Sequence, residues 1–158
     1  MPQFDTPALA VLARSDLRYE VVRTPPAGSI EEAARLRGVT VDSVLKTLVV
    51  RRGEDDHLFV VLAGDRIIDW SKLRRVLGVR RVSLPDSDEA KAVTGYERGA
   101  ITPFGSATEL PVFVDATVAA KGQVSIGGGG HGVSVRTDAT ALIATLGATT
   151  ADISKAAG

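Results

Sequence analysis

Two apolar runs joined by a short polar link constrain the fold of this chain most strongly. Residues 45–52 begin with a Val- and Leu-rich run, residues 58–63 form another, and the link holds Gly53 and three acidic residues. The pattern predicts two paired strands, in which successive side chains point to opposite faces. Because both faces of the first strand are largely apolar, we expect that strand to be buried on both sides.

Lys46 interrupts this apolar strand. It either extends its ammonium group to water at the start of the strand or points into a pocket. An unpaired ammonium is costly to bury, so the second alternative requires a polar site around it.

The remaining pattern predicts one α+β domain over residues 1–158, with a curved, mixed, mostly antiparallel, barrel-like sheet surrounded by helices. Helix-capping residues and terminating glycines punctuate the chain. We expect helices to begin after Thr6, Ser29, Asp69, Asp86 and Thr137 or Asp138, and three of them to end near Gly38, Gly78 and Gly147. Further strands are expected at 17–23, 80–84, 112–115, 122–126 and 132–136, and residues 148–158 resemble a frayed tail.

Composition narrows the function classes. The 158 residues carry no cysteine and a formal net charge of zero, which excludes disulfides and thiolate chemistry and argues against strong nonspecific nucleic-acid binding. Two separated histidines make a zinc site unfavourable, and we expect no metal and no cofactor. Neither a signal peptide nor a membrane-spanning run is evident, so we expect a cytoplasmic protein without a membrane partner.

The segment from Gly95 to Gly105 holds three glycines and Pro103. Glycine permits positive φ and close approach to the main chain, and proline fixes φ and donates no N–H. The Gly99-x-x-x-Pro103 loop is therefore either a tight surface turn or a rigid backbone cradle that presents amides to a ligand.

A second glycine-rich segment covers residues 127–132 and includes His131. It is either a hairpin between two strands or a closely approached backbone for a ribose or phosphate. It matches neither a Walker loop nor a dinucleotide fingerprint. His131 is either an exposed turn residue or a general base.

Basic residues also cluster locally in the sequence. The cluster is either a solvated surface or a modest tRNA-contact patch. The cluster consists of Arg51, Arg52, Lys72, Arg74, Arg75, Arg80 and Arg81.

Taken together, the order and spacing of three segments resemble the YbaK and prolyl-tRNA-synthetase-associated editing domains. The segments are Leu45-Lys46-Thr47-Leu48-Val49, the Gly99-x-x-x-Pro103 loop and the glycine-rich segment after residue 126. The resemblance extends from about residue 6 to residue 153. It implies an aminoacyl-tRNA deacylase of the same fold, with mischarged tRNA, most directly tRNA(Pro), as its partner and prolyl-tRNA synthetase as a second one.

The resemblance also assigns roles to individual residues. It places Lys46 in the active site and carries Gly99 and Pro103 over to the substrate loop. Backbone N–H groups can stabilise charge on an ester carbonyl oxygen. Ala100, Ile101 and Thr102 are then expected to line the pocket, and Gly128, Gly129, Gly130 and His131 to contact substrate.

The amino acid to be removed stays open at this point. The Lys46-Thr47 pair resembles the branch that deacylates Cys-tRNA(Pro). Gly127, Ser134 and the region of Thr24 depart from that branch. Cysteine or another small amino acid is the expected target, and a noncatalytic module that binds a tRNA end or a synthetase is the alternative.

Overall fold

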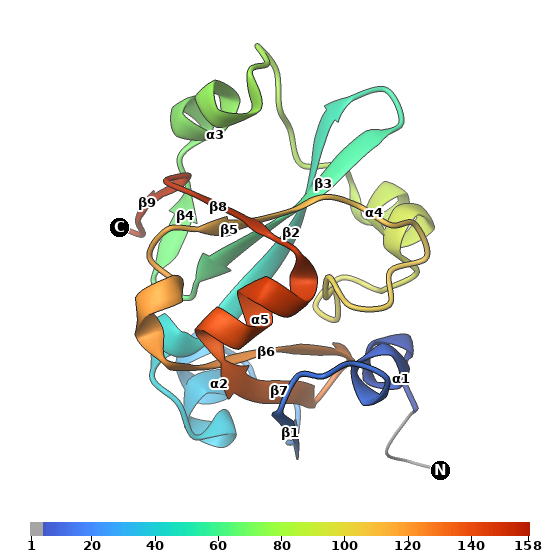
Figure 1. Ribbon diagram of the computed structural model, residues 1–158, viewed down its shortest axis with the longest axis vertical. Helices are drawn as coiled ribbons and strands as arrows, with labels where there is room; N and C mark the ends of the chain where they lie inside the picture. The colour runs from blue at the N-terminus through green and yellow to red at the C-terminus, as the bar shows by residue number, and fades with distance from the viewer. Residues whose placement is uncertain (1–4) are drawn as a thin grey trace.

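The computed structural model describes residues 5–158. Two curved sheets face each other, with α5 between them and the other helices at their periphery (Figure 1). The first sheet has the order β2 (Leu45–Gly53), β3 (Asp56–Ala63), β5 (Val112–Asp115) and β8 (Thr149–Ala151). The second has the order β1 (Tyr19–Arg23), β7 (Val133–Asp138) and β6 (Gln123–Gly130), and β4 (Arg66–Ile68) pairs with β9 (Ser154–Ala156).

Strand directions confirm the α+β class with a mixed, mostly antiparallel sheet. The β2–β3, β1–β7, β6–β7 and β4–β9 pairs are antiparallel, and the β3–β5 and β5–β8 pairs are parallel. The described strands form open sheets and do not close into a full barrel.

The helices begin at the capping residues that the sequence predicts. Each of these side chains accepts a hydrogen bond from a first-turn amide and so satisfies a donor that the helix leaves free. The helices are α1 (Pro7–Ala13), α2 (Ile30–Arg37), α3 (Trp70–Leu77), α4 (Ser87–Thr94) and α5 (Ala139–Leu146), with 3-10 turns η2 (Val41–Ser43) and η3 (Ala119–Lys121).

Three local expectations are wrong. Residues 80–84 form no strand; only Ser83 makes a bridge, to Arg51. The segment from residue 148 onward is not frayed, because β8 and β9 pair with β5 and β4, and the Ile153 amide donates to the Asp115 carboxylate at 3.1 Å. Four of the glycines expected in a turn instead form the end of β6, and the turn lies at residues 131–132.

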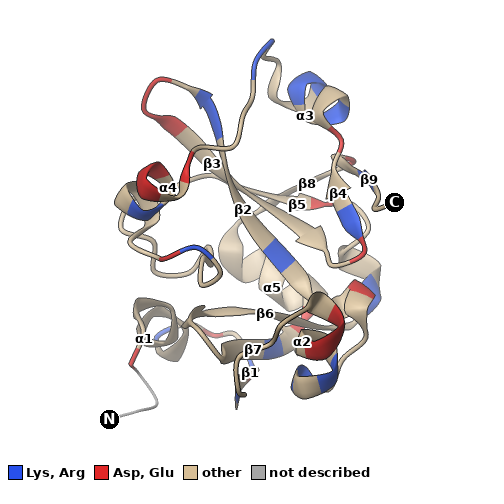
Figure 2. Ribbon diagram, turned by 180° about the vertical axis from the view of Figure 1, so that it is seen from behind, with Lys and Arg blue, Asp and Glu red and all other residues tan. Residues whose placement is uncertain are grey.

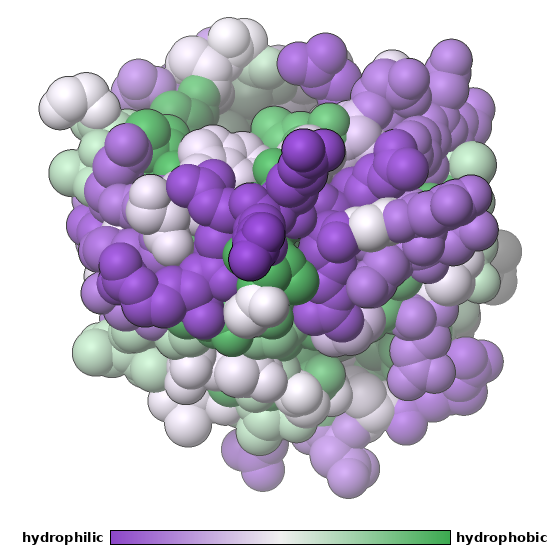
Figure 3. Space-filling view, turned by 90° about the horizontal axis from the view of Figure 1, so that it is seen from above, coloured by the Kyte–Doolittle hydropathy of each residue, from purple (hydrophilic) through white to green (hydrophobic). Residues whose placement is uncertain are grey.

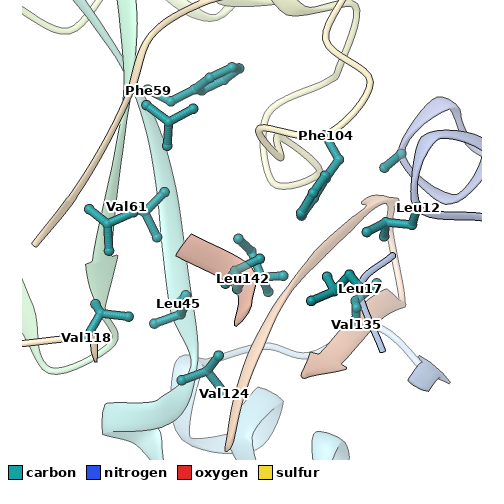
Figure 4. Packing of buried hydrophobic residues seen from close by; sticks show 14 of the residues in the cluster. Leu12, Leu17, Leu45, Phe59, Val61, Phe104, Val118, Val124, Val135 and Leu142 are labelled. Atoms are coloured by element: carbon teal, nitrogen blue, oxygen red, sulfur yellow. The ribbon is translucent and has the colours of Figure 1, made fainter. Parts of the chain in front are cut away.

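The first sheet is buried on both faces, as its apolar pattern predicts. Phe59 and Val61 of β3 point into a cluster that lies between the two sheets, where Figure 4 shows Leu45, Val124, Val135 and Leu142 converging. The alternating residues of β3 point into a second cluster against α3, made by Leu58, Val60, Leu62, Leu73 and Ile153. The antiparallel pairing sets Leu45 opposite Ala63 and Lys46 opposite Leu62, and this register sets the direction of each β2 side chain.

The outer edge of β2 is only partly covered. Val44 bridges Ser125 of β6 at one end, and Arg51 bridges Ser83 at the other. Arg51 exchanges two backbone hydrogen bonds with Ser83, at 2.8 and 3.0 Å, so its amide and carbonyl point outward. Because backbone groups alternate sides along a strand, those of Thr47 and Val49 also point outward, into the gap between the two bridges.

Candidate functional site

A cavity of about 760 Å³ occupies the gap along the open edge of β2. Helix α2, helix α4, the loop after α4 and one glycine of β6 form its other walls. The lining residues are Ile30, Ala33, Arg37, Val44, Leu45, Lys46, Thr47, Leu48, Val49, Leu84, Pro85, Asp86, Ser87, Ala90, Arg98, Gly99, Ile101 and Gly127. This volume lies in the range of pockets that enclose a ligand of drug size, roughly 300–1,000 Å³.

Lys46 lies in this lining and is half-buried. Its Nζ donates a hydrogen bond to the backbone carbonyl of Arg66, which follows the β3 strand end. Burial lowers the pKa of Lys46 from its ordinary value, and the negative charge of Asp65 opposes that shift. The ammonium is thus held at the cavity with a backbone carbonyl as its hydrogen-bond acceptor.

The loop after α4 is held rigidly, and part of it reaches the cavity. Gly95 ends α4 in the left-handed conformation, and the Tyr96 hydroxyl donates to the Phe104 carbonyl at 2.6 Å across the loop. Gly99 has a φ of 88°, which L side chains rarely adopt. Gly99 and Ile101 line the cavity, and within residues 5–158 neither amide donates to a protein acceptor. Neither amide is therefore committed to a hydrogen bond within residues 5–158.

Three other residues of this loop lie outside the cavity lining. The Ala100 amide donates to the Glu97 carbonyl at 2.9 Å, which removes it from the set of free donors. Thr102 is fully buried, its Oγ1 has no partner among the described atoms, and it does not reach the lining. Pro103 is partly exposed and is also absent from the lining.

The glycine-rich segment of β6 contributes one residue, Gly127, to the lining. Its next three glycines allow close packing against neighbouring backbone and side chains. A Cβ on Gly128 would lie 2.7 Å from Val133, and one on Gly129 would lie 3.0 Å from Tyr96. These contacts account for Gly128 and Gly129 without a ligand, whereas a Cβ on Gly130 would meet nothing closer than Thr6 Cγ2 at 3.4 Å, which is ordinary contact.

His131 lies beside the substrate-loop candidate Gly99 but outside the cavity lining. Its side chain is 61% exposed, and its Nε2 is 3.6 Å from a Glu97 carboxylate oxygen. A Cβ placed on Gly99 would approach the His131 ring to 3.3 Å. The exposed-turn interpretation therefore fits the environment of His131 better than a buried general base.

Among the polar residues of the lining, Arg37, Arg98 and Thr47 were not predicted as site residues. Arg37, at the end of α2, is half-buried with a pKa lowered by burial, and its Nη1 donates only a long 3.5 Å bond to Ser125 Oγ. Arg98 lines the opposite wall. The buried Oγ1 of Thr47 has no hydrogen-bond partner among the described residues. No local pattern marks any of the three, because the two arginines lie on separate elements and Thr47 is an ordinary strand residue.

The cavity combines these groups in one place. Cations from β2, α2 and the loop after α4 line the cavity together with one carboxylate, that of Asp86, and with residues that are otherwise largely apolar. Gly99 and Ile101 also line it, and their amides donate to no acceptor within residues 5–158. Such a site can hold an anionic or polarised ligand and can stabilise negative charge on an oxygen atom. Within residues 5–158, no group of three His, Cys, Asp or Glu side chains is arranged to hold a metal, and no helix is long and apolar enough to cross a membrane.

Comparison with known proteins identifies a family to which this sequence is similar. The family described as an aminoacyl-tRNA editing domain matches residues 24–145. A proline–tRNA ligase of Brachyspira hyodysenteriae is 26% identical over 75% of this chain, which spans 21% of that ligase. A multifunctional Ser/Thr-tRNA deacylase, ProXp-y, of Escherichia coli K12 is 30% identical over 68% of this chain and 66% of the relative.

A solved structure supports the assignment at the level of the fold. The crystal structure of a putative trans-editing enzyme for prolyl-tRNA synthetase has a TM-score of 0.80 and 28% identity, and 87% of each chain is covered. The family match covers well over half of the sequence, so the chain belongs to the aminoacyl-tRNA editing domain family.

Proposed function

We propose that this protein is a trans-editing deacylase, which hydrolyses the ester bond of a mischarged aminoacyl-tRNA in the cavity along β2. The observation that carries the proposal is that Lys46, Gly99 and Ile101 line one cavity, and that the amides of Gly99 and Ile101 donate to no acceptor within residues 5–158. Family membership supports the reaction class. The cavity volume suits a small amino acid with its terminal nucleoside.

The chemistry rests on positioning and on charge. Lys46 holds the aminoacyl end of the substrate, and the Gly99 and Ile101 amides donate to the ester carbonyl oxygen as negative charge develops on it. Removing one such donor from an enzyme costs roughly 3–4 kcal/mol of transition-state stabilisation. A water molecule attacks the ester carbon with help from the hydroxyl of the terminal ribose, so the protein supplies neither a nucleophile nor a metal ion.

Thr47 supports a substrate with a small polar side chain. Thr47 belongs to the cavity lining, and its buried Oγ1 has no hydrogen-bond partner among the described residues. A ligand hydroxyl or thiol that reaches this oxygen on binding would satisfy it. The Escherichia coli relative is named for serine and threonine esters, and prolyl-tRNA synthetases occur among the relatives. We therefore propose tRNA(Pro) carrying serine, threonine or cysteine as the substrate.

Thr47→Val should change selectivity without loss of stability. A buried hydroxyl without a partner costs roughly 1–3 kcal/mol, so the melting temperature should stay constant or rise. Hydrolysis of the serine ester should fall on the order of tenfold relative to the alanine ester, because the variant cannot hydrogen-bond the substrate hydroxyl. Single-turnover rates for the two esters measure this ratio.

Ser106→Ala is the matched control for that variant. Ser106 also carries a buried hydroxyl without a partner among the described residues, but it lies outside the cavity lining. Its ratio of serine to alanine hydrolysis should equal that of the wild type. An unchanged ratio in Thr47→Val would remove Thr47 from the specificity pocket.

The proposed reaction is tested with tRNA(Pro) charged with cysteine, serine, threonine, alanine or proline. We expect hydrolysis of at least one of the mischarged species, no hydrolysis of Pro-tRNA(Pro), and the same rates after treatment with EDTA. Loss of activity in EDTA with recovery on adding zinc would contradict the metal-free mechanism. Tight binding of every species without turnover would favour the noncatalytic module instead.

A further inference from the structure

A second cavity, of about 620 Å³, lies at the far end of β2. The β2–β3 hairpin, α3 and the segment after α3 form its walls. Five arginines line it together with one acidic residue, Glu54, and we call these five the arginine basin: Arg51, Arg52, Arg74, Arg80 and Arg81. Figure 2 shows basic segments on β2, on α3 and on the loop between α3 and α4 surrounding this end of the molecule.

The basin keeps a surplus of positive charge. Arg52 pairs with Asp56 at 3.0 Å, and Arg51 lies 3.7 Å from Glu89. Across the described residues, no carboxylate lies within ion-pair distance of Arg80 or Arg81, both of which are exposed. Arg74 donates only to the Ser71 hydroxyl. The whole chain has a formal net charge of zero, so this concentration of cations is local.

The surface around the basin is open to a large partner. Figure 3 looks down on this end of the molecule and shows mostly hydrophilic residues across it. Arginine forks bind phosphate oxygens through paired N–H donors, and clustered arginines on a concave surface are typical of contacts to a nucleic-acid backbone. Val82 is the one large apolar residue of the lining, so the five guanidinium groups favour an anionic partner over an apolar one.

The basin adjoins the first cavity. The backbone bridge between Arg51 and Ser83 separates the two, and the next residues along the chain, Leu84 and Pro85, already line the first cavity. Along β2, Arg51 lies five residues from Lys46, or roughly 17 Å at the rise of an extended strand. A nucleic acid whose aminoacyl end is held at Lys46 and whose chain runs along this edge of β2 can place the phosphates that precede its terminal nucleotide at the basin.

We infer that the arginine basin binds the phosphate backbone of the nucleic acid whose 3′ end enters the first cavity. This inference rests on the proposed function for the identity of that nucleic acid. The basin supplies affinity for the tRNA body without taking part in ester hydrolysis. It separates recognition of the tRNA from recognition of the aminoacyl group.

The test compares two charge-neutralised double variants. Arg80→Gln with Arg81→Gln removes two unpaired cations from the basin. Arg14→Gln with Arg18→Gln removes two exposed arginines near α1 and β1, at the opposite end of the molecule in Figure 1. Both pairs carry the same change in net charge, so a difference between them reports position and not overall charge.

Binding of uncharged tRNA(Pro) transcript is measured by fluorescence anisotropy over a range of salt concentrations. We expect the basin variant to bind on the order of tenfold more weakly, and its salt slope to fall by about one for each phosphate that the variant no longer neutralises. The control pair should bind as the wild type does. Equal weakening by the two pairs, or no tRNA binding by the wild type, would overturn the inference.

A minimal ester distinguishes this inference from the proposed function. Hydrolysis of an aminoacylated terminal nucleoside should be unchanged in the basin variant, whereas KM for whole charged tRNA should rise with kcat retained. If the wild type binds tRNA through the basin but hydrolyses no ester, the proposed function is wrong and the inference that the basin binds tRNA is confirmed. Equal losses of hydrolysis rate on the minimal ester and on whole charged tRNA would overturn the inference that the basin binds tRNA.

Discussion

Replacing Lys46 with alanine should abolish most deacylation while the protein stays folded. The loss of a charge that holds the reacting group is expected to slow single-turnover hydrolysis on the order of 10²–10³-fold. Stability should change little, because burial disfavours the charged form of Lys46 and its one hydrogen bond is to the Arg66 carbonyl. Single-turnover rates and thermal melting of the same preparations measure the two effects.

The direction of the Lys46 pKa shift adds a pH dependence. A lowered pKa means that the folded protein loses this proton below the ordinary lysine value of 10.5. Burial of Lys46 therefore lowers the free energy of unfolding at pH values below the pKa that Lys46 has in the folded protein. This lowering disappears as the pH rises through 10.5. As the pH rises, binding of an inert aminoacyl-adenosine amide to the wild type should weaken with a midpoint below 10.5, because Lys46 loses its charge. This weakening should be absent in Lys46→Ala.

Lys155→Ala is the matched control for Lys46. Lys155 is exposed on β9, outside the cavity lining. Its loss removes the same charge and should leave the hydrolysis rate within about twofold of the wild type, the range expected for a surface substitution away from the site. A Lys46→Ala protein as active as Lys155→Ala would remove Lys46 from the mechanism.

Replacing Gly64 with alanine should be the most destabilising single substitution near the site. A Cβ at this position would lie 2.2 Å from the Val41 carbonyl oxygen and 2.9 Å from that of Val44. Both are backbone atoms, so η2 and the start of β2 must move. The cost is expected to be about 3 kcal/mol, or a fall in melting temperature of roughly 10 °C for a chain of this size.

Gly53→Ala provides the comparison for Gly64. Its added Cβ would meet nothing closer than Asp56 Cβ at 3.6 Å, which is ordinary contact. Thermal melting should therefore separate the two alanine variants clearly. Activity should fall only in Gly64→Ala, because the displaced segment leads directly into Lys46. Equal melting temperatures would mean that the junction between η2 and β2 adapts at little cost.

The predictable parts of the fold are those determined by local sequence. Caps such as Ser29 and Asp69 bond amides three residues away, so their effect is visible in a short window. The two-sided burial of β2 and β3 follows from their apolar runs. The β4–β9 pair was missed because it joins segments about ninety residues apart, and each segment has only three residues.

The candidate site was predictable only in part, for the same reason. Lys46, Gly99 and Ile101 line one cavity, and their roles in a reaction remain predictions. The next glycines of β6 pack against α1 and its neighbours, because Gly129 must let Thr6 and Ala8 approach closely. Arg37 lines the cavity from the end of α2, with its Nη1 3.5 Å from Ser125 Oγ of β6, and no pattern within α2 reveals this placement.

The central claim is that ester hydrolysis takes place in the cavity along β2. The most direct measurement is a crystal structure with a stable amide analogue of seryl-adenosine. We predict that its carbonyl oxygen lies within hydrogen-bond distance of the Gly99 or Ile101 amide, with Lys46 beside the aminoacyl group and the serine hydroxyl at Thr47. Density for the analogue elsewhere on the protein, with this cavity empty, would contradict the account.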